Sequence, residues 1–212
     1  MLTVAAGVGF ALALLPIIVT PGASFTLVTG RALVGDRGGA VAVIGGTSLG
    51  ILTHAVLAGL GLAAIVMASV EAFQALRLVG ALVMIGLGAQ LLWRARRART
   101  NPVEQHRAVP PKLPVWPTLA KAYGANVFNV KAAAVYLTLA PQFLSADQAV
   151  VPAMVGLALL HIVIQVTWLG LCVMGWGRIA RRVDPVRWRR RIDALGGLVL
   201  VALGIRGAIA SR

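Results

Sequence analysis

The segment VTPGASFTLVTGR (Val19–Arg31) places Pro21 and Gly22 inside a run with no charged residue from Met1 to Gly30. Proline has no amide hydrogen and disrupts the hydrogen bond to the carbonyl about four residues earlier, and glycine adopts conformations that other residues avoid. Inside a bilayer, freed backbone groups persist only where protein or a water-filled cavity satisfies them. The segment therefore predicts a membrane helix that breaks beside a cavity, with a simple kink as the alternative.

The whole chain has the composition of an integral membrane protein. Of its 212 residues, 59% are hydrophobic and only 12% are charged, which is not the balance of a soluble domain. Candidate spans reach or approach the ~20 residues that a helix needs to cross a bilayer, and they are Met1–Gly30, Gly38–Val70, Leu78–Trp93, Ala132–Ala146, Gln148–Gly177 and Ile192–Ile209. We predict an all-α membrane protein with six transmembrane helices, of which spans 1 and 4 are broken.

The positive charge is concentrated in alternate loops. The formal net charge is +14, and sixteen of the twenty Lys and Arg residues lie in Arg31–Arg37, Arg94–Lys121 and Arg178–Arg191. In a six-span chain these loops share one side, which the positive-inside rule assigns to the cytoplasm, so both termini are expected outside it. No basic run is interleaved with aromatic residues as single-strand binding requires, and no nucleic-acid partner is predicted.

The two halves of the chain resemble each other. Thr20 and Asn129 each stand at the end of a stretch of uncharged residues, and they lie 109 residues apart. The segment GALVMIGLG (Gly80–Gly88) is similar to GGLVLVALG (Gly196–Gly204), which begins 116 residues later. Similar offsets indicate an internal duplication. Because each half holds three spans, the second half must enter the membrane in the opposite orientation.

This duplication predicts three parts: a first three-helix repeat over residues 1–93, a basic cytoplasmic linker over 94–117, and a second three-helix repeat over 118–212. Inverted repeats are typical of transporters, in which broken helices from the two halves meet near the bilayer midplane and face a substrate.

Several segments, taken in order, carry a family resemblance. They are TPG (Thr20–Gly22), GRALVGDRGG (Gly30–Gly39), GTSLGILTHAVLAGLGL (Gly46–Leu62), RLVGALVMIGLGAQLL (Arg77–Leu92), NVFNVKAAAVYLTLAPQFL (Asn126–Leu144) and LGGLVLVALGIR (Leu195–Arg206). Together they resemble the LysE/RhtB family, the lysine and homoserine/threonine exporters of bacteria. The resemblance implies a multi-pass exporter of the bacterial inner membrane with periplasmic termini, and not an enzyme.

The chain departs from the family where substrates would be sorted. The family pattern in the first span is Thr-Pro-Gly-Pro-Asn, and here Ala23 and Ser24 stand in place of its last two residues. The family pattern in the fourth span is Asn-Pro-Lys-Ala, and here Val130 stands in place of its proline. The substrates of the best-known members are therefore not carried over to this chain.

The residues expected to bind substrate surround the two breaks, and they are Thr20, Pro21, Gly22, Ser24, Asn126, Asn129 and Lys131. Lys131 is the only Lys or Arg well inside a long span, where a cation costs at least about 2.5 kcal/mol unless it is paired or wet. It would pair with an amino acid carboxylate beside the amides freed near Pro21, or else extend to the cytoplasmic surface. Asn126 and Asn129 share a helix face, where they bind either substrate or a neighbouring helix.

Two histidines are candidates for proton coupling. His54 and His161 lie near the centres of their spans, and imidazole changes charge near neutral pH. None of the six acidic residues is expected deep in a span, which favours these histidines as the proton carriers. The same absence favours a neutral zwitterion over a cationic amino acid as cargo. A structural hydrogen bond is the alternative for each histidine. Asp36 in the first cytoplasmic loop is a gate candidate, with a solvated turn as its alternative.

The sequence thus predicts export of a small neutral amino acid or derivative in exchange for protons. The alternative cargo is another small solute or a metal ion. Clustered metal ligands are missing from the sequence pattern, so no metal site and no cofactor are expected. Cys172 is the single cysteine, which excludes a disulfide relay. The expected partners are the amino acid, protons and the lipid bilayer, and a homodimer is left open.

Overall fold

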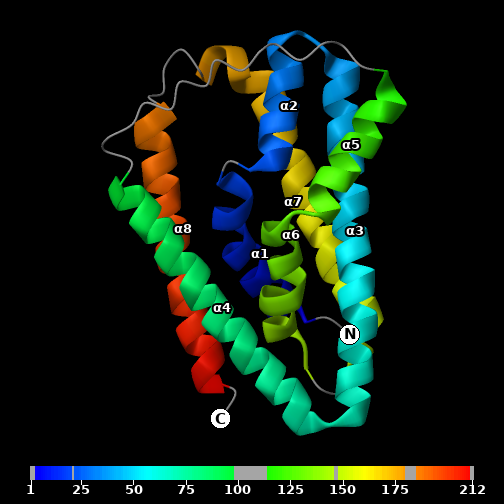
Figure 1. Ribbon diagram of the computed structural model, residues 1–212, viewed down its shortest axis with the longest axis vertical. Helices are drawn as coiled ribbons and strands as arrows, with labels where there is room; N and C mark the ends of the chain where they lie inside the picture. The colour runs from blue at the N-terminus through cyan, green and yellow to red at the C-terminus, as the bar shows by residue number, and fades with distance from the viewer. Residues whose placement is uncertain (1–2, 21, 98–113, 146–147, 180–184, 211–212) are drawn as a thin grey trace.

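The computed structural model describes residues 3–20, 22–97, 114–145, 148–179 and 185–210, and every regular element in them is a helix (Figure 1). In chain order these are α1 (Val4–Val19), α2 (Ala23–Leu33), α3 (Arg37–Ala68), α4 (Val70–Arg97), α5 (Val115–Val127), α6 (Val130–Ala134), a π-helical turn η1 (Val135–Leu139), a 3₁₀ turn η2 (Ala140–Phe143), α7 (Val150–Ile179) and α8 (Pro185–Ala210). The all-α prediction is confirmed for this part of the chain.

Several of these helices have the length and composition of membrane spans. Arg37–Ile65, Leu78–Arg97 and Val150–Gly175 each qualify alone. α1 and α2, bent by 59° at their break, qualify only together, as one broken span or a re-entrant loop. Large apolar side chains such as Leu57 and Val163 are exposed on the outside of the bundle, as lipid contact requires. The chain is thus a multi-pass membrane protein, while a count of six spans also needs α8 and the run from α5 to η2 and stays a prediction.

The first predicted break is present. α1 ends at Val19, and Thr20 has extended backbone angles instead of helical ones. The amide and hydroxyl of Thr20 both donate to the Pro16 carbonyl, at 3.1 Å and 2.7 Å, so the last turn of α1 is closed locally. α2 then begins after Gly22 without a side-chain cap. Pro21, to which the break was attributed, lies outside the described residues.

The second break is present as well, and an asparagine makes it. α5 ends at Val127, and the Asn129 side chain then accepts the Lys131 amide at 3.0 Å as the N-cap of α6. Asparagine is among the best N-caps, so the chain restarts a helix here without the family's proline. Pro141 cannot donate a helical hydrogen bond, and the helix becomes irregular around it, through η1 and η2.

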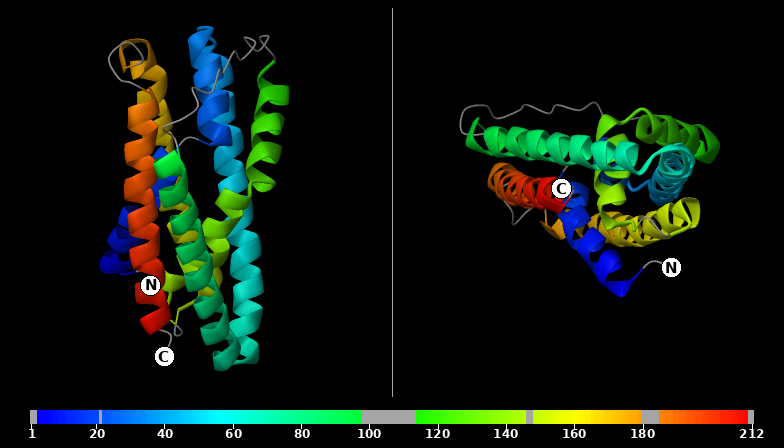
Figure 2. Two further views of the ribbon diagram at one scale, coloured as in Figure 1. Left: turned by 60° about the vertical axis from the view of Figure 1, so that its left-hand side comes forward. Right: turned by 90° about the horizontal axis from the view of Figure 1, so that it is seen from below.

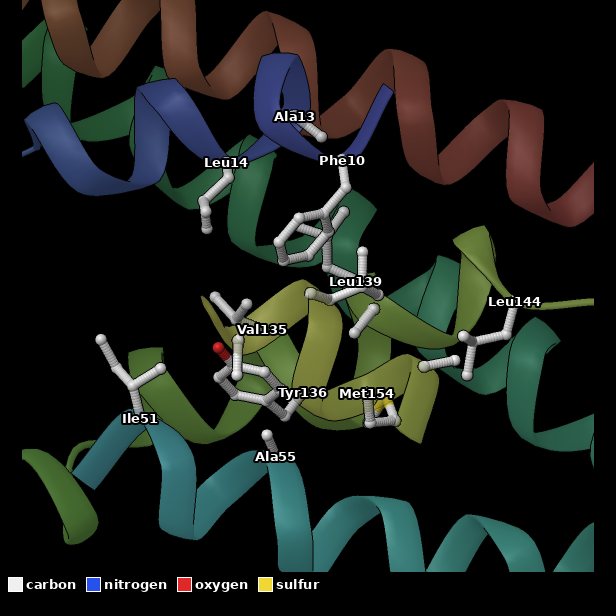
Figure 3. Packing of buried hydrophobic residues seen from close by; sticks show 14 of the residues in the cluster. Phe10, Ala13, Leu14, Ile51, Ala55, Val135, Tyr136, Leu139, Leu144 and Met154 are labelled. Carbon is white, nitrogen blue, oxygen red and sulfur yellow. The ribbon is translucent and has the colours of Figure 1, made fainter. Parts of the chain in front are cut away.

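The helices form one elongated bundle around the two breaks (Figures 1 and 2). Core side chains from α1, α3, η1 and α7, among them Phe10, Ile51, Tyr136 and Met154, converge on its centre (Figure 3). α1 begins and α8 ends toward the lower end of Figure 1, whereas the α2–α3 connection lies at the upper end. The basic α2–α3 connection and the two terminal helix ends therefore lie at opposite ends of the bundle.

α4 and α8 pack closely along their length through small residues. A Cβ added at Gly197 would lie 2.7 Å from the Gly88 carbonyl oxygen, and one added at Gly204 would lie 2.7 Å from the Ala81 carbonyl oxygen. Membrane helices commonly associate through such close backbone contacts. Lipid is as apolar as the side chains, so the hydrophobic effect does not drive helices together in a bilayer.

We predict that Gly197→Ala destabilises the protein although alanine is the better helix former. The added methyl group would overlap the α4 backbone, and overpacking of this kind costs about 1 to 3 kcal/mol. The matched control is Gly61→Ala in α3, where an added Cβ meets nothing within 4 Å. Thermal unfolding in detergent should show a lower Tm for Gly197→Ala only, and equal Tm values would contradict the packing described.

Candidate functional site

A cavity lies where the two helix breaks meet. Its volume is about 70 Å³, enough for several water molecules or a small solute, and side chains from α1, α2, α5, α6, η1 and α7 line it. The lining includes every described residue predicted to bind substrate and one of the two histidines, namely Thr20, Gly22, Ser24, Asn126, Asn129, Lys131 and His161. The structure therefore brings these residues together, while their roles stay predictions.

Lys131 joins the two breaks directly. Its Nζ donates to the Thr20 carbonyl oxygen at 2.9 Å, across 111 residues of sequence. In a continuous helix that carbonyl would accept an amide one turn later, and the break leaves it available. The amine thus points at the break in the first span, which disagrees with the alternative that it extends to the cytoplasmic surface.

The two asparagines play different parts. Asn129 caps α6, whereas Asn126 is buried and its backbone carbonyl bonds to His54 Nε2 at 3.1 Å. The Asn126 side chain packs directly against Gly50 of α3. A Cβ added at Gly50 would lie only 2.6 Å from the Asn126 Oδ1. Among the described residues this Oδ1 has no hydrogen-bond partner. Asn126 therefore combines a helix contact with an acceptor at the edge of the cavity.

The two histidines flank a buried tyrosine. The Tyr136 ring stacks on His54 and on His161, with ring centroids 6.3 Å and 5.9 Å apart, and the Tyr136 hydroxyl bonds to His161 Nδ1 at 2.9 Å. His161 lines the cavity, but His54 does not. The structural bond predicted as the alternative is thus present for both histidines, and only His161 can meet a solute directly.

Sequence reasoning missed Tyr136 as a site residue. A tyrosine inside a span carries a hydroxyl that needs a partner, which is the signal that could have identified it. Gln165 of α7 is 7% exposed and lines the cavity, and its amide nitrogen has no hydrogen-bond partner among the described residues.

One acidic residue is buried in the bundle, while the prediction that none lies deep in a membrane span stays a prediction. Asp193 of α8 is only 3% exposed. The arginines just before it, such as Arg190 and Arg191, suggested a position at the membrane surface. In the structure α8 runs without interruption from Pro185 to Ala210 and turns Asp193 inward while Arg190 and Arg191 are exposed.

Asp36 lies away from the cavity and ties two helices together. It accepts from the Arg31 guanidinium at 3.1 Å and caps α3 by accepting the Gly39 amide at 2.8 Å. The side chains of Arg31 and Asp36 are only 6% and 16% exposed, so this is not the solvated turn that was the alternative. Its role as a gate stays a prediction.

Fold and cavity together define a membrane protein with a small cavity, lined by both polar and apolar residues, between broken helices. The family profile described as LysE type translocator matches residues 15–211. An uncharacterized membrane protein of Bacillus subtilis (strain 168), YrhP, is 24% identical over 193 residues, covering 89% of this chain and 91% of the relative. An uncharacterized membrane protein of Vibrio cholerae serotype O1 is 34% identical over 110 residues, covering 52% of this chain and 50% of the relative. No solved structure matches.

The chain therefore belongs to the LysE type translocator family. Membership confirms the resemblance read from the sequence. It makes the chain a transporter of a family that exports amino acids or similar solutes, and not an enzyme at the level of the family.

We predict that Tyr136→Phe lowers stability through His161. Loss of the hydroxyl leaves a buried imidazole nitrogen without its partner, which costs about 1 to 3 kcal/mol. The matched control is Tyr123→Phe, because the Tyr123 hydroxyl contacts Thr53 at 3.3 Å in an exposed position. Thermal unfolding in detergent should separate the two variants, and an equal decrease in Tm for both would contradict the assignment.

Proposed function

We propose that the chain is a secondary transporter that exports a small neutral amino acid, or a close derivative, across the bacterial inner membrane in exchange for protons. The observation that carries the proposal is the bond from Lys131 to the Thr20 carbonyl at the edge of a cavity shared by both helix breaks. A cation is expensive in this position, and a solute carboxylate gives it a function.

The carboxylate of the solute would bind at Lys131. An ammonium has three donors, and one of them goes to Thr20, so the group can take a carboxylate without leaving its anchor. The uncapped start of α2 adds the positive end of a helix dipole, with Gly22, Ala23 and Ser24 in the cavity wall. The Gln165 amide supplies a neutral donor. The same cation repels a metal ion, which disfavours the metal-export alternative and leaves another small solute as the second candidate.

Contacts between α4 and α8 support the inverted repeat. The sequence offset of 116 residues pairs Gly88 with Gly204 and Ala81 with Gly197. The close approaches observed are Gly88 to Gly197 and Gly204 to Ala81. If each residue is replaced by its equivalent in the other half, the first contact becomes the second. Reciprocal contacts of this kind are expected from a two-fold relation. Two inverted halves can rock about the cavity to expose it to either side in turn.

His161 is the favoured proton carrier. It lies in the cavity wall and bonds to Tyr136, whose ring also stacks on His54. An exchange mechanism needs a group whose protonation is felt by the solute, and a histidine in the same chamber meets this need. The orientation proposed places the α2–α3 connection in the cytoplasm and the lower ends of α1 and α8 at the periplasm (Figure 2).

We predict that Lys131→Met lowers uptake of neutral amino acids into inside-out vesicles about 10- to 100-fold. A hydrogen bond to a charged group contributes about 1.5 to 3 kcal/mol, which corresponds to that range. The matched control is Lys121→Met, which removes an exposed lysine of α5.

Three outcomes separate the parts of this proposal. Uptake that depends on Lys131 and on an imposed pH gradient supports it fully. No uptake of any amino acid by the wild type, with or without a pH gradient, contradicts the function. Uptake that falls equally in both lysine variants, or in neither, contradicts the site.

A further inference from the structure

The hydroxyl of Tyr136 is fully buried and has one partner among the described residues. Tyr136 belongs to the apolar core (Figure 3), and none of its surface is exposed. The hydroxyl lies 2.9 Å from Nδ1 of His161, and the described part of the chain offers it no other hydrogen bond. A buried hydroxyl without an acceptor is unfavourable, so the Tyr136 hydroxyl donates its hydrogen to Nδ1.

This bond decides which nitrogen of His161 carries the ring hydrogen. A neutral imidazole has one nitrogen that donates and one that accepts, and the bond made by one nitrogen fixes the state of the other. Because Nδ1 accepts from the hydroxyl, the hydrogen of a neutral His161 lies on Nε2. In the reverse arrangement Nδ1 would donate to the tyrosine oxygen, and the phenolic hydrogen would have no acceptor inside the apolar core.

The Nε2 atom of His161 is accessible to a solute. His161 lines the cavity, although only 5% of its surface is exposed. No described residue forms a hydrogen bond with Nε2, and yet Nε2 is not among the side-chain atoms that are buried without a partner. The small exposed part of His161 therefore includes Nε2, the nitrogen that carries the hydrogen.

Lys131 favours the neutral form of His161. Both residues line the same small cavity, and Lys131 brings a positive charge to it. An imidazolium would add a second positive charge, and like charges repel strongly where water is scarce. The cavity thus offers one charged donor, the Lys131 ammonium, and one neutral donor, the His161 Nε2–H. A carboxylate has two acceptor oxygens and suits such a pair of donors.

We propose that Tyr136 holds His161 in the neutral tautomer with its hydrogen on Nε2, and that this N–H binds the solute carboxylate together with Lys131. This inference rests on the proposed function, in which the carboxylate lies at Lys131 and His161 carries the proton. A further proton can enter the ring only at Nδ1, so the Tyr136 hydroxyl must turn away before His161 takes one. Tyr136 is thus a positioning residue, which acts on the solute only through His161.

Nitrogen NMR of isotopically labelled histidine measures the tautomer directly, because protonated and unprotonated ring nitrogens differ widely in chemical shift. In the full-length wild type in lipid at neutral pH, the signal that is lost in His161→Gln should show hydrogen on Nε2 and none on Nδ1. Tyr136→Phe removes the donor and should give a mixture of tautomers, whereas Tyr123→Phe should keep the wild-type signal. Hydrogen on Nδ1 of wild-type His161 would overturn the assignment.

A pair of substitutions at His161 tests the carboxylate role and does not require Tyr136→Phe to fold. The amide nitrogen of glutamine can lie where Nε2 lay, and that of asparagine where Nδ1 lay. In radioligand binding to the purified protein, His161→Gln should therefore bind alanine, valine or leucine about 10- to 100-fold more tightly than His161→Asn. Leucinamide, which lacks the carboxylate, should bind equally to the two variants.

The outcomes separate this inference from the proposed function. If the wild type binds and moves none of the three amino acids, the proposed function fails. If the wild type binds one of them and His161→Gln and His161→Asn bind it with equal affinity, only the role of the His161 Nε2–H is overturned.

Discussion

The hydrogen bond from the Lys131 ammonium to the Thr20 carbonyl joins two parts of the chain that are each unfavourable alone. A helix break inside a membrane leaves a carbonyl without its amide, and a lysine inside a membrane leaves a cation without solvent. The Lys131 ammonium supplies the donor that the Thr20 carbonyl lacks, and the carbonyl supplies an acceptor for the ammonium. The cavity lies at this junction, beside the end of α1 and the start of α6.

The surrounding bundle holds this junction from two sides. α3 accommodates α5 through Gly50, which leaves room for Asn126, and His54 of the same helix bonds to the Asn126 carbonyl. α4 and α8 pack through glycines, and their contacts repeat under the offset that relates the two halves of the sequence. Close packing on both sides with an irregular centre is compatible with the proposed movement of two inverted halves.

Sequence patterns predicted the two breaks and most of the polar residues of the cavity wall, but not the burial of Asp193 or the contacts of Tyr136. Thr20 and Asn129 were identifiable because a helix break or cap has a local chemical signature. Asp193 was not, because its burial depends on which side α8 turns toward α1, and the neighbouring arginines gave a misleading signal. The hydroxyl of Tyr136 in an apolar run signals that it needs a partner, but only packing between helices determines that the ring contacts His54 and His161. Such contacts arise from packing between distant segments, which a single sequence does not encode locally.

The most direct measurement is the accessibility of the cavity wall at Ser24. In a Cys172→Ser background, Ser24→Cys would be exposed to a water-soluble thiol reagent in membranes, with and without a neutral amino acid such as alanine, valine or leucine. We predict that the cysteine is modified, that at least one of these amino acids slows the modification, and that Lys131→Met abolishes this protection. A cysteine that stays unmodified, or protection that persists without the lysine, would contradict a wet binding site built around residue 131.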